Sequence, residues 1–243
     1  MPNYKCGNMK PSKKSKIIIL LGAPGSGKGT QAELLSEKIN LYYFETSKIL
    51  EEKFSERKVD NKASIKLEGK KYYFKKEKKL WERGILCSPP FVTHLVIKKI
   101  KELHKAGKSL ILSGSPRTLY EGERLIPLLK KLYGKESIDV VLLEQSEKTS
   151  IFRNSHRRIC ELARHPILYT KETTKLKKCP LDGSKLLKRK GLDDPETIKV
   201  RLKEYRERTF PLVELFKKQG LRIKRINAEN TPADVFKNIL KVL

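Results

Sequence analysis

Five short apolar segments alternate with amphipathic segments along the 243 residues of the chain. The apolar segments cover residues 17–21, 41–44, 110–112, 138–143 and 221–226. The first is an unbroken run of β-branched or aliphatic side chains, as a strand buried on both faces of a parallel sheet requires. We therefore expect an α/β fold in which a mostly parallel five-stranded sheet carries helices on both faces and binds ligands at the carboxyl ends of its strands.

Helical periodicity fills most of the chain between these segments. The predicted helices cover residues 32–39, 49–57, 91–104, 119–133, 147–158 and 195–219, and a terminal helix follows residue 231. Thr46 and Ser47 can cap the second of these helices, and Thr231 with Pro232 can cap the last. Strand and helix thus alternate along most of the sequence, which favours parallel strands joined by helical crossovers.

Three segments do not follow this alternation. Residues 1–15 are polar and lysine-rich, which predicts a loose tail. A lysine-rich stretch around Gly69 predicts a small hairpin. Residues 160–190 lose their periodicity while Cys, His, Pro, Gly and Lys accumulate, so we expect an inserted loop or small mobile lobe there.

The chain is strongly basic, with 55 Lys and Arg against 28 Asp and Glu and a formal net charge of +27. Such a charge attracts polyanions, which include nucleotides, nucleic acid and anionic membrane surfaces. The lysines recur along the whole chain and on the polar faces of helices, which favours solvated surfaces over a dedicated nucleic-acid site. The sequence has no RNA-binding motif, so we do not expect a nucleic-acid partner. A monomer is the default expectation because no exposed apolar stripe stands out.

Cysteine usage and hydropathy indicate a cytoplasmic protein. Four cysteines in a chain of this length do not make a disulfide framework, which favours a reducing compartment. No apolar segment is long enough to cross a bilayer, so no membrane association is expected. The basic start and first apolar segment imitate a short signal peptide, but cleavage after that segment would destroy the glycine-rich loop that follows.

This glycine-rich loop is the strongest chemical signal in the chain. It reads Gly22-Ala-Pro-Gly-Ser-Gly-Lys-Gly-Thr30. Its glycines lack the Cβ atoms that would block close approach, so backbone N–H groups can form an anion-binding nest at a helix N-terminus, where Lys28 adds a full charge. The spacing fits a Walker A loop, except that Gly29 follows the lysine and the first hydroxyl is Thr30. We favour a phosphate site over the alternative, a strand-turn-helix without a ligand.

Four further motifs lie at the ends of predicted elements. They read Gly114-Ser-Pro-Arg-Thr118, His156-Arg157-Arg158, Asp193-Asp194-Pro195-Glu196 with Arg201-Leu202, and Thr209-Phe-Pro-Leu212. With the phosphate loop, their order and spacing resemble those of the adenylate kinase family of nucleoside monophosphate kinases, over almost the whole chain. The resemblance implies one P-loop kinase domain at residues 16–243, with a lobe for the monophosphate at 46–84 and a lid at 158–190 that closes on ATP.

The resemblance also implies a reaction and a set of residues that perform it. The reaction is reversible phosphoryl transfer from ATP to AMP, giving two ADP, with Mg²⁺, and it requires alignment and charge stabilisation more than covalent work. The family pattern gives catalytic roles to Lys28, Arg117, Arg157 and Arg201. It places ATP at Gly25, Ser26, Gly27, Lys28, Gly29, Thr30, Arg153 and Arg157. It places the acceptor at Thr46, Gly114, Arg117 and Arg201, and Arg189 is a candidate lid arginine.

Several positions depart from the family pattern. Ser113 replaces the aspartate that helps to order the metal's water shell, and Glu51 replaces an arginine of the monophosphate lobe. The glutamine that commonly reads the adenine of AMP falls near Glu121, and this lobe is longer than usual by about a dozen residues. The cations that could substitute near Glu51 are Lys48, Lys53 and Arg57. We therefore keep open a kinase of another monophosphate, a nucleotide-binding or regulatory homologue with little catalysis, and an RNA-associated factor.

The predicted lid contains residues that resemble a metal site. Cys179-Pro-Leu-Asp-Gly183 is similar to the second half of the zinc knuckle in some lids of this family, and Cys160 stands at the position of its first ligand. Ala163 occupies the position of the missing partner cysteine. The expected set for a structural Zn²⁺ is Cys160, His165, Cys179 and Asp182. The alternative is that these are ordinary lid residues of a reducing compartment.

Overall fold

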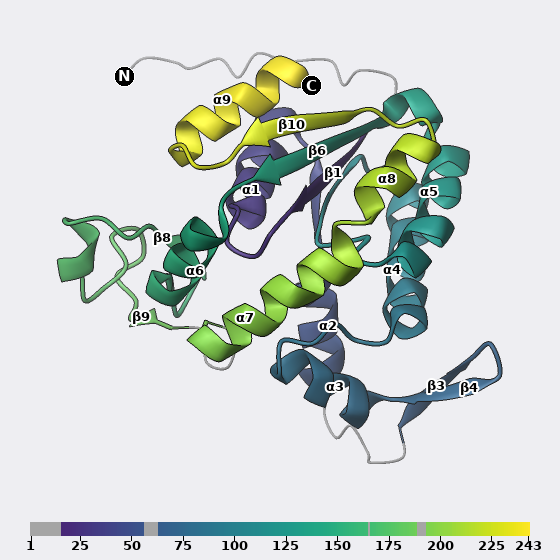
Figure 1. The fold of residues 1–243 in the computed structure, drawn as a ribbon, viewed down its shortest axis with the longest axis horizontal. Helices are drawn as coiled ribbons and strands as arrows, with labels where there is room; N and C mark the ends of the chain where they lie inside the picture. The colour runs from purple at the N-terminus through teal and green to yellow at the C-terminus, as the bar shows by residue number, and fades with distance from the viewer. Residues whose placement is uncertain (1–15, 56–62, 165, 189–192) are drawn as a thin grey trace.

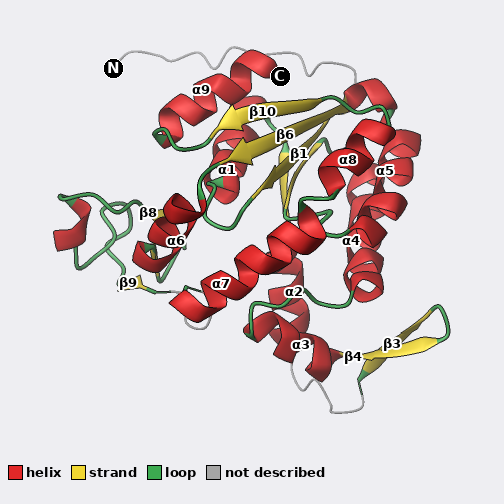
Figure 2. Ribbon diagram, viewed as in Figure 1, coloured by secondary structure: helices red, strands yellow, loops and turns green. Residues whose placement is uncertain are grey.

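A five-stranded sheet forms the centre of the molecule (Figure 1; Figure 2). The computed structural model describes residues 16–55, 63–164, 166–188 and 193–243. The strands are β1 (Ile17–Gly22), β2 (Tyr42–Glu45), β5 (Leu110–Ser113), β6 (Ile138–Glu144) and β10 (Ile223–Asn227). They lie in the order β10-β6-β1-β5-β2, and every neighbouring pair is parallel. The predicted five-stranded α/β fold is confirmed.

Helices cover both faces of this sheet, because alternate side chains of β1 enter two different hydrophobic cores. Ile17 and Ile19 pack into one core with α4 (Pro89–Lys105), α5 (Leu119–Tyr133) and α8 (Leu212–Lys218). Ile18 and Leu20 pack into the other core with α1 (Lys28–Ile39) and α9 (Pro232–Val242). All four of these isoleucine and leucine side chains are at most 1% exposed, which explains the unbroken apolar run in the sequence. None of the helices in the described ranges is long and apolar enough to span a membrane.

Described residues within 46–84 form what we call the hairpin segment. It consists of α2 (Thr46–Ser55), the antiparallel pair β3 (Ser64–Leu67) and β4 (Lys70–Tyr73), and α3 (Phe74–Glu82). The predicted hairpin around Gly69 is confirmed. The expected start of α2 was wrong, because Thr46 and Ser47 lie inside the helix instead of capping it. Sequence periodicity missed α3, whose only buried residue is Glu77.

Described residues 158–188 form a second projection, the small-sheet segment. Its strands β7 (Arg158–Cys160), β8 (Pro166–Ile167) and β9 (Leu186–Leu187) make an antiparallel sheet in the order β8-β7-β9. The preceding helix α6 (Glu147–His156) ends two residues before its predicted end, because Arg157 has extended backbone angles and leads into β7. Figure 1 shows this segment at the left, away from the sheet, and the hairpin segment at the bottom.

The predicted helix over residues 195–219 is divided in two. The first part is α7 (Pro195–Glu204), residues Tyr205–Thr209 form a wider π-helical turn, and α8 begins after Pro211. Proline has no backbone N–H to donate, which is one reason why a single continuous helix does not form. π-helical turns are frequent at functional sites, and Thr209 at the end of this turn lines the cavity described below.

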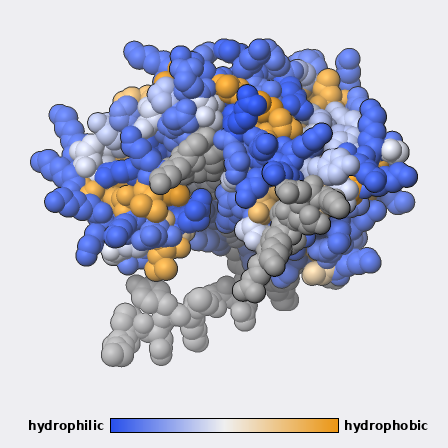
Figure 3. Space-filling model, turned by 90° about the horizontal axis from the view of Figure 1, so that it is seen from below, coloured by the Kyte–Doolittle hydropathy of each residue, from blue (hydrophilic) through white to orange (hydrophobic). Residues whose placement is uncertain are grey.

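The surface seen from below is mostly hydrophilic, with apolar residues in separate patches (Figure 3). Several large exposed apolar side chains belong to the small-sheet segment or to α6 beside it. They are Phe152, Leu162, Leu168, Tyr169, Leu181 and Leu187. Three of these, Phe152, Leu168 and Tyr169, also line the cavity at the carboxyl ends of the sheet strands.

Candidate active site

A cavity of about 1160 Å³ opens at the carboxyl ends of the parallel strands. The phosphate loop and the strand-end residues Glu45 and Ser113 line its floor, and the hairpin and small-sheet segments contribute to its walls. This is the position at which parallel α/β sheets bind ligands. The volume exceeds the usual range of about 300–1,000 Å³ for a small-molecule pocket, so there is room for more than one nucleotide.

The glycine-rich loop has the backbone conformation that its sequence predicts. Gly25 and Gly27 have φ angles of 81° and 84°, in the left-handed region that favours glycine. Helix α1 begins at Lys28, and its N-cap residue, Gly27, offers no side chain to accept hydrogen bonds from the first N–H groups. The first turn of α1 also contains no acidic residue. An anion bound in the cavity would supply both the missing acceptor and the missing negative charge.

Lys28 is bent back onto the loop that precedes it. Its Nζ donates to the carbonyl oxygens of Gly22 and Ala23 at 2.7 and 2.9 Å. Burial, followed by the positive charges of Arg117, Arg201 and Arg157, lowers the pKa of Lys28 from 10.5 to about 7. Four predicted catalytic cations are therefore close enough to repel one another, as expected in a site that receives a highly charged anion.

A buried carboxylate holds two of these cations in place. Arg157 Nε donates to Asp193 Oδ2 at 3.0 Å, and Arg157 Nη2 donates to the other oxygen of the same carboxylate. Arg201 Nη1 lies 3.6 Å from Asp193 Oδ1. The Asp193 side chain is 2% exposed, whereas each arginine side chain is 22% exposed and lines the cavity. The sequence did not reveal this role of Asp193. The neighbouring Asp194 caps α7, so the Asp193 carboxylate is available to pair with the two arginines.

Arg117 is positioned by the loop between β5 and α5. The hydroxyl of Thr209 donates to the Arg117 carbonyl at 2.8 Å, which links this loop to the end of the π-helical turn. Gly114 has a φ of 88°, and a Cβ at that position would overlap the guanidinium of Arg117. Gly114 therefore contributes to the site by the absence of a side chain, which lets Arg117 fold across the loop.

Glu121, in the first turn of α5, supports the same loop. Thr118 caps α5, and the carboxylate of Glu121 accepts hydrogen bonds from the Thr118 and Ser115 hydroxyls and the Arg117 N–H. This is a capping-box arrangement, in which the residue three positions after the cap reaches back toward the helix start. Burial raises the pKa of Glu121 above its usual range, although these hydrogen bonds oppose the shift. Its carboxylate therefore supports the conformation of Arg117.

Arg153 makes its contacts at the carboxyl ends of β6 and β10. Its guanidinium donates to Gln145 Oε1 at 3.1 Å and to the carbonyl oxygens of Ala228 and Glu229 at 2.8 and 3.2 Å. Arg153, Ala228 and Glu229 line the cavity, whereas Gln145 does not. The edges of the guanidinium are thus occupied by protein groups, whereas arginine can still offer its planar face to an aromatic ring.

The acceptor side of the cavity is different in character. The hydroxyl of Thr46 is buried without a hydrogen-bond partner in the described structure, although Thr46 lines the cavity, so a ligand could satisfy it. Glu51 also lines the cavity, and its Oε1 lies 4.0 Å from Arg164 Nη2 of the small-sheet segment. Lys48 lies 3.7 Å from Glu45. Arg57 and Arg189, which the sequence suggested as phosphate ligands, lie outside the described residues.

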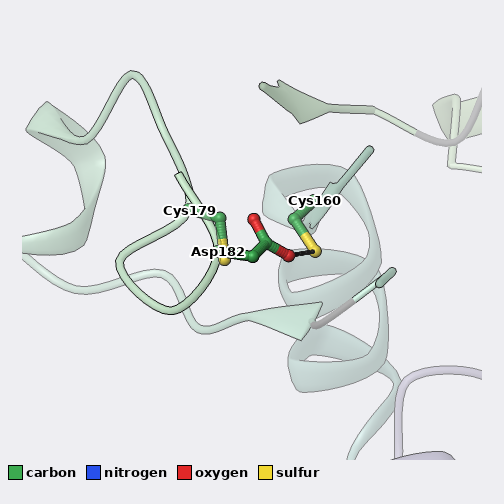
Figure 4. Close-up of side chains that lie close together, drawn as sticks. All are labelled: Cys160, Cys179 and Asp182. Carbon is green, nitrogen blue, oxygen red and sulfur yellow. Dashed lines mark hydrogen bonds between the residues drawn. The ribbon is translucent and has the colours of Figure 1, made fainter. Parts of the chain in front are cut away.

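Three of the four expected metal ligands meet in the small-sheet segment (Figure 4). The two Cys sulfurs and a carboxylate oxygen of Cys160, Cys179 and Asp182 lie within 4.8 Å of one another, and Cys160 donates to Asp182 at 3.1 Å. Hydrogen bonds from Ser184, then from Cys160, hold the pKa of Asp182 below its usual range. Both cysteines are buried, and His165 lies outside the described residues. Two sulfurs and a carboxylate are a donor set that suits Zn²⁺.

Comparison with known proteins agrees with this geometry. A family model described as adenylate kinase matches residues 20–221. The chain is 34% identical over 229 residues to an adenylate kinase of Caldicellulosiruptor bescii, which covers 93% of this chain and 98% of that protein. It is 34% identical over 227 residues to an adenylate kinase of Methanothrix thermoacetophila and 32% over 228 residues to one of Clostridium botulinum, each covering 93% of this chain and 97% of the relative. This chain therefore belongs to the adenylate kinase family.

Proposed function

We propose that the protein catalyses reversible phosphoryl transfer from ATP to AMP, giving two ADP. The observation that carries the proposal is that Lys28, Arg117, Arg157 and Arg201 line one cavity, where burial and then the charges of the three arginines lower the pKa of Lys28. Phosphoryl transfer depends on aligning two phosphate groups and stabilising the negative charge between them. Four cations at one point of a cavity with room for two nucleotides are suited to this task.

ATP is assigned to the side of the phosphate loop. The backbone of residues 25–30 and the N-terminus of α1 receive the β- and γ-phosphates, and Lys28 turns from its carbonyl acceptors toward them. Asp193 holds the Nε–Nη2 edge of Arg157, so Arg157 binds the transferred group through its Nη1–Nη2 edge. Because protein oxygens already occupy the edges of Arg153, we assign its planar face to stacking on the base of ATP.

The acceptor monophosphate is assigned to the other side of the cavity. Arg117 and Arg201 bind its phosphate, the backbone of Gly114 allows Arg117 to reach it, and the buried hydroxyl of Thr46 gains a partner from the nucleotide. We further propose that the hairpin segment is the monophosphate lobe and that the small-sheet segment is the lid. Closure of both over the cavity would exclude water and so favour transfer to the acceptor over hydrolysis.

Proton uptake on ATP binding should reveal the state of Lys28. In the nucleotide-free protein its pKa is about 7, and the phosphates of ATP should raise that pKa because they stabilise the charged form. At pH 8 we therefore expect uptake of about one proton per ATP, and affinity should weaken as the pH rises above 7. Calorimetric titrations in buffers of different ionisation enthalpy measure this uptake. Equal uptake by the Lys28→Met variant would contradict the assignment.

A structural Zn²⁺ in the lid is a second proposal. Cys160, Cys179 and Asp182 would hold it, and the ion would tie β7 to the turn at residues 179–183. We expect about one zinc per chain in protein purified without added metal, none in Cys179→Ala, and a lower melting temperature after chelation. Elemental analysis measures the first two quantities. Absence of zinc from both proteins would refute the proposal.

A coupled assay with ATP and a panel of nucleoside monophosphates tests the proposed reaction. We expect turnover with AMP as the best acceptor and loss of turnover in Lys28→Ala. Preference for another monophosphate would correct the acceptor and retain the transfer chemistry. Tight ATP binding without turnover on any acceptor would instead identify a nucleotide-binding homologue, the alternative that Ser113 and Glu51 keep open.

A further inference from the structure

The carboxyl ends of β2 and β5 lie side by side at the floor of the cavity. In the register of these two parallel strands, Glu45 is the partner of Ser113, and both residues line the cavity together with Thr30. Ser113 cannot supply a negative charge, whereas Glu45 can. A carboxylate is therefore present one strand away from the position where the family pattern has its aspartate.

Tyr43 connects these two residues to the phosphate loop. The negative charge of Glu45 and the side chain of Ser113 both act on its hydroxyl. A Cβ on Gly29 would lie 3.4 Å from the same hydroxyl, so this oxygen is next to the residue that follows Lys28. Burial, then the negative charge of Glu45, raises the pKa of Tyr43, which keeps its hydroxyl protonated as a donor. Tyr43 thus has the Glu45 carboxylate on one side and the phosphate loop on the other.

Three other described carboxylates that line the cavity have stronger fixed partners. Glu121 supports the Arg117 loop, as described above. Glu204 accepts from the Leu86 N–H at 3.0 Å and from Arg208 at 2.8 Å, and Glu229 accepts from the Ser146 N–H at 2.6 Å. Glu45 accepts from the Ser47 hydroxyl at 2.8 Å, and its cation neighbour Lys48 lies farther away, at 3.7 Å. Its side chain is 27% exposed and can therefore reach water in the cavity.

We propose that Glu45 is the positioning residue that orders the water shell of the Mg²⁺ accompanying ATP. The proposal rests on the proposed function. Mg²⁺ keeps several waters and is usually held by phosphates and one or two carboxylates, and it neutralises charge on the phosphates. The donors present here fit such an ion, since the hydroxyls of Thr30 and Ser113 and the carboxylate of Glu45 line one cavity. Glu45 supplies the charge that Ser113 lacks, from the neighbouring strand.

Metal binding to the protein–ATP complex tests this proposal without relying on turnover. Electron paramagnetic resonance titration with Mn²⁺ gives the affinity of the complex for the metal. We expect Glu45→Gln to weaken that affinity at least tenfold, in the range known for groups that orient metal ligands. ATP binding in the presence of a chelator should stay the same or improve, because a negative charge near the phosphates has been removed. Thermal unfolding should change little, since glutamine keeps the shape of glutamate.

Two further variants make the test specific. Glu33→Gln is the matched control, because Glu33 also lines the cavity and its charge acts on Tyr43, but it lies on α1 instead of a strand end. We expect the Mn²⁺ affinity of this variant to stay within about threefold of that of the unchanged protein. This is less than the change caused by removing a group that orients metal ligands. Adding Ser113→Asp to Glu45→Gln should restore most of the lost affinity, because it returns a carboxylate to the adjacent strand end.

The two proposals fail in different ways. Equal Mn²⁺ affinity in Glu45→Gln and the unchanged protein would overturn the role of Glu45, and so would an equal loss in Glu33→Gln. Neither result would affect the proposed reaction, provided that the unchanged protein converts ATP and AMP to ADP. If the unchanged protein bound Mn²⁺ in a manner that depends on Glu45 but did not convert ATP and AMP to ADP, the proposed reaction would be overturned. The assignment of Glu45 to the metal would then be retained.

Discussion

Replacing Lys28 by methionine should lower kcat by about a thousandfold, because removing one preorganised charge from a transition-state site costs about 10²–10³ in rate. Lys28 is the buried cation of the phosphate loop, and the other three cations act on it from the surrounding cavity. Steady-state assays in the ADP-forming direction measure the effect. Lys99→Met is the matched control, because the Lys99 side chain is 41% exposed on α4, pairs only loosely with Glu102 and does not line the cavity. A loss below tenfold in Lys28→Met would contradict the assigned role.

The same variant should not destabilise the nucleotide-free protein at neutral pH. The pKa of Lys28 is lowered from 10.5 to about 7 on folding, so the unfolded chain binds more protons between these values. Below pH 7 the buried charge of Lys28 therefore lowers the free energy of unfolding by its full amount. This loss of stability disappears as the pH rises toward 10.5. We expect Lys28→Met to raise the melting temperature at pH 6, and the difference from the unchanged protein should narrow at pH 10. A difference that widens with pH would contradict this explanation.

Replacing Asp193 by alanine should reduce both activity and stability. Arg157 and Arg201 would lose the buried carboxylate that positions them, and breaking a buried ion pair typically costs about 3–5 kcal/mol in the free energy of unfolding. Misplacement of catalytic groups by about 1 Å can cost about a hundredfold in rate, and we expect a loss of that size in kcat. Urea unfolding and steady-state kinetics measure the two effects.

Asp194→Ala provides the control for Asp193→Ala. Asp194 is the adjacent residue and also a carboxylate, but its side chain accepts from the Thr197 N–H and caps α7. Loss of a helix cap costs about 1 kcal/mol, so this variant should be mildly destabilised and keep kcat within a few-fold of the unchanged protein. Equal loss of activity in the two variants would show that the loss does not come from the ion pairs of Asp193 with Arg157 and Arg201.

The parts of this fold that the sequence predicted are those set by local pattern. The buried β1 run, the phosphate loop and α5 follow from uninterrupted apolar residues, glycine spacing and amphipathic periodicity, and α5 has the predicted bounds. Local pattern failed where contacts between distant residues decide the conformation. Helix α3 has only nine residues, its one buried residue is Glu77, which accepts from the Ser88 N–H, and its aromatic side chains Phe74 and Trp81 are only partly buried.

The candidate site divides in a similar way. Residues within motifs, such as Lys28 and Arg117, were identified from spacing and resemblance, and the structure brings them to one cavity. The carboxylates that support them were not identified. Asp193 acts across 36 residues on Arg157, and the relation of Glu45 to Ser113 depends on the register of two strands that are 65 or more residues apart in the chain. Such relations depend on tertiary structure, which a single sequence does not specify locally.

Incubation of the purified protein with Mg²⁺ and ADP alone tests the central claim most directly. Because the proposed reaction is reversible, ADP should be converted to ATP and AMP in equal amounts, and chromatographic separation of the three nucleotides measures each of them. Lys28→Met should leave the ADP almost unchanged over the same time. Unchanged ADP with the unmodified protein, or AMP formed without an equal amount of ATP, would contradict phosphoryl transfer between two bound nucleotides.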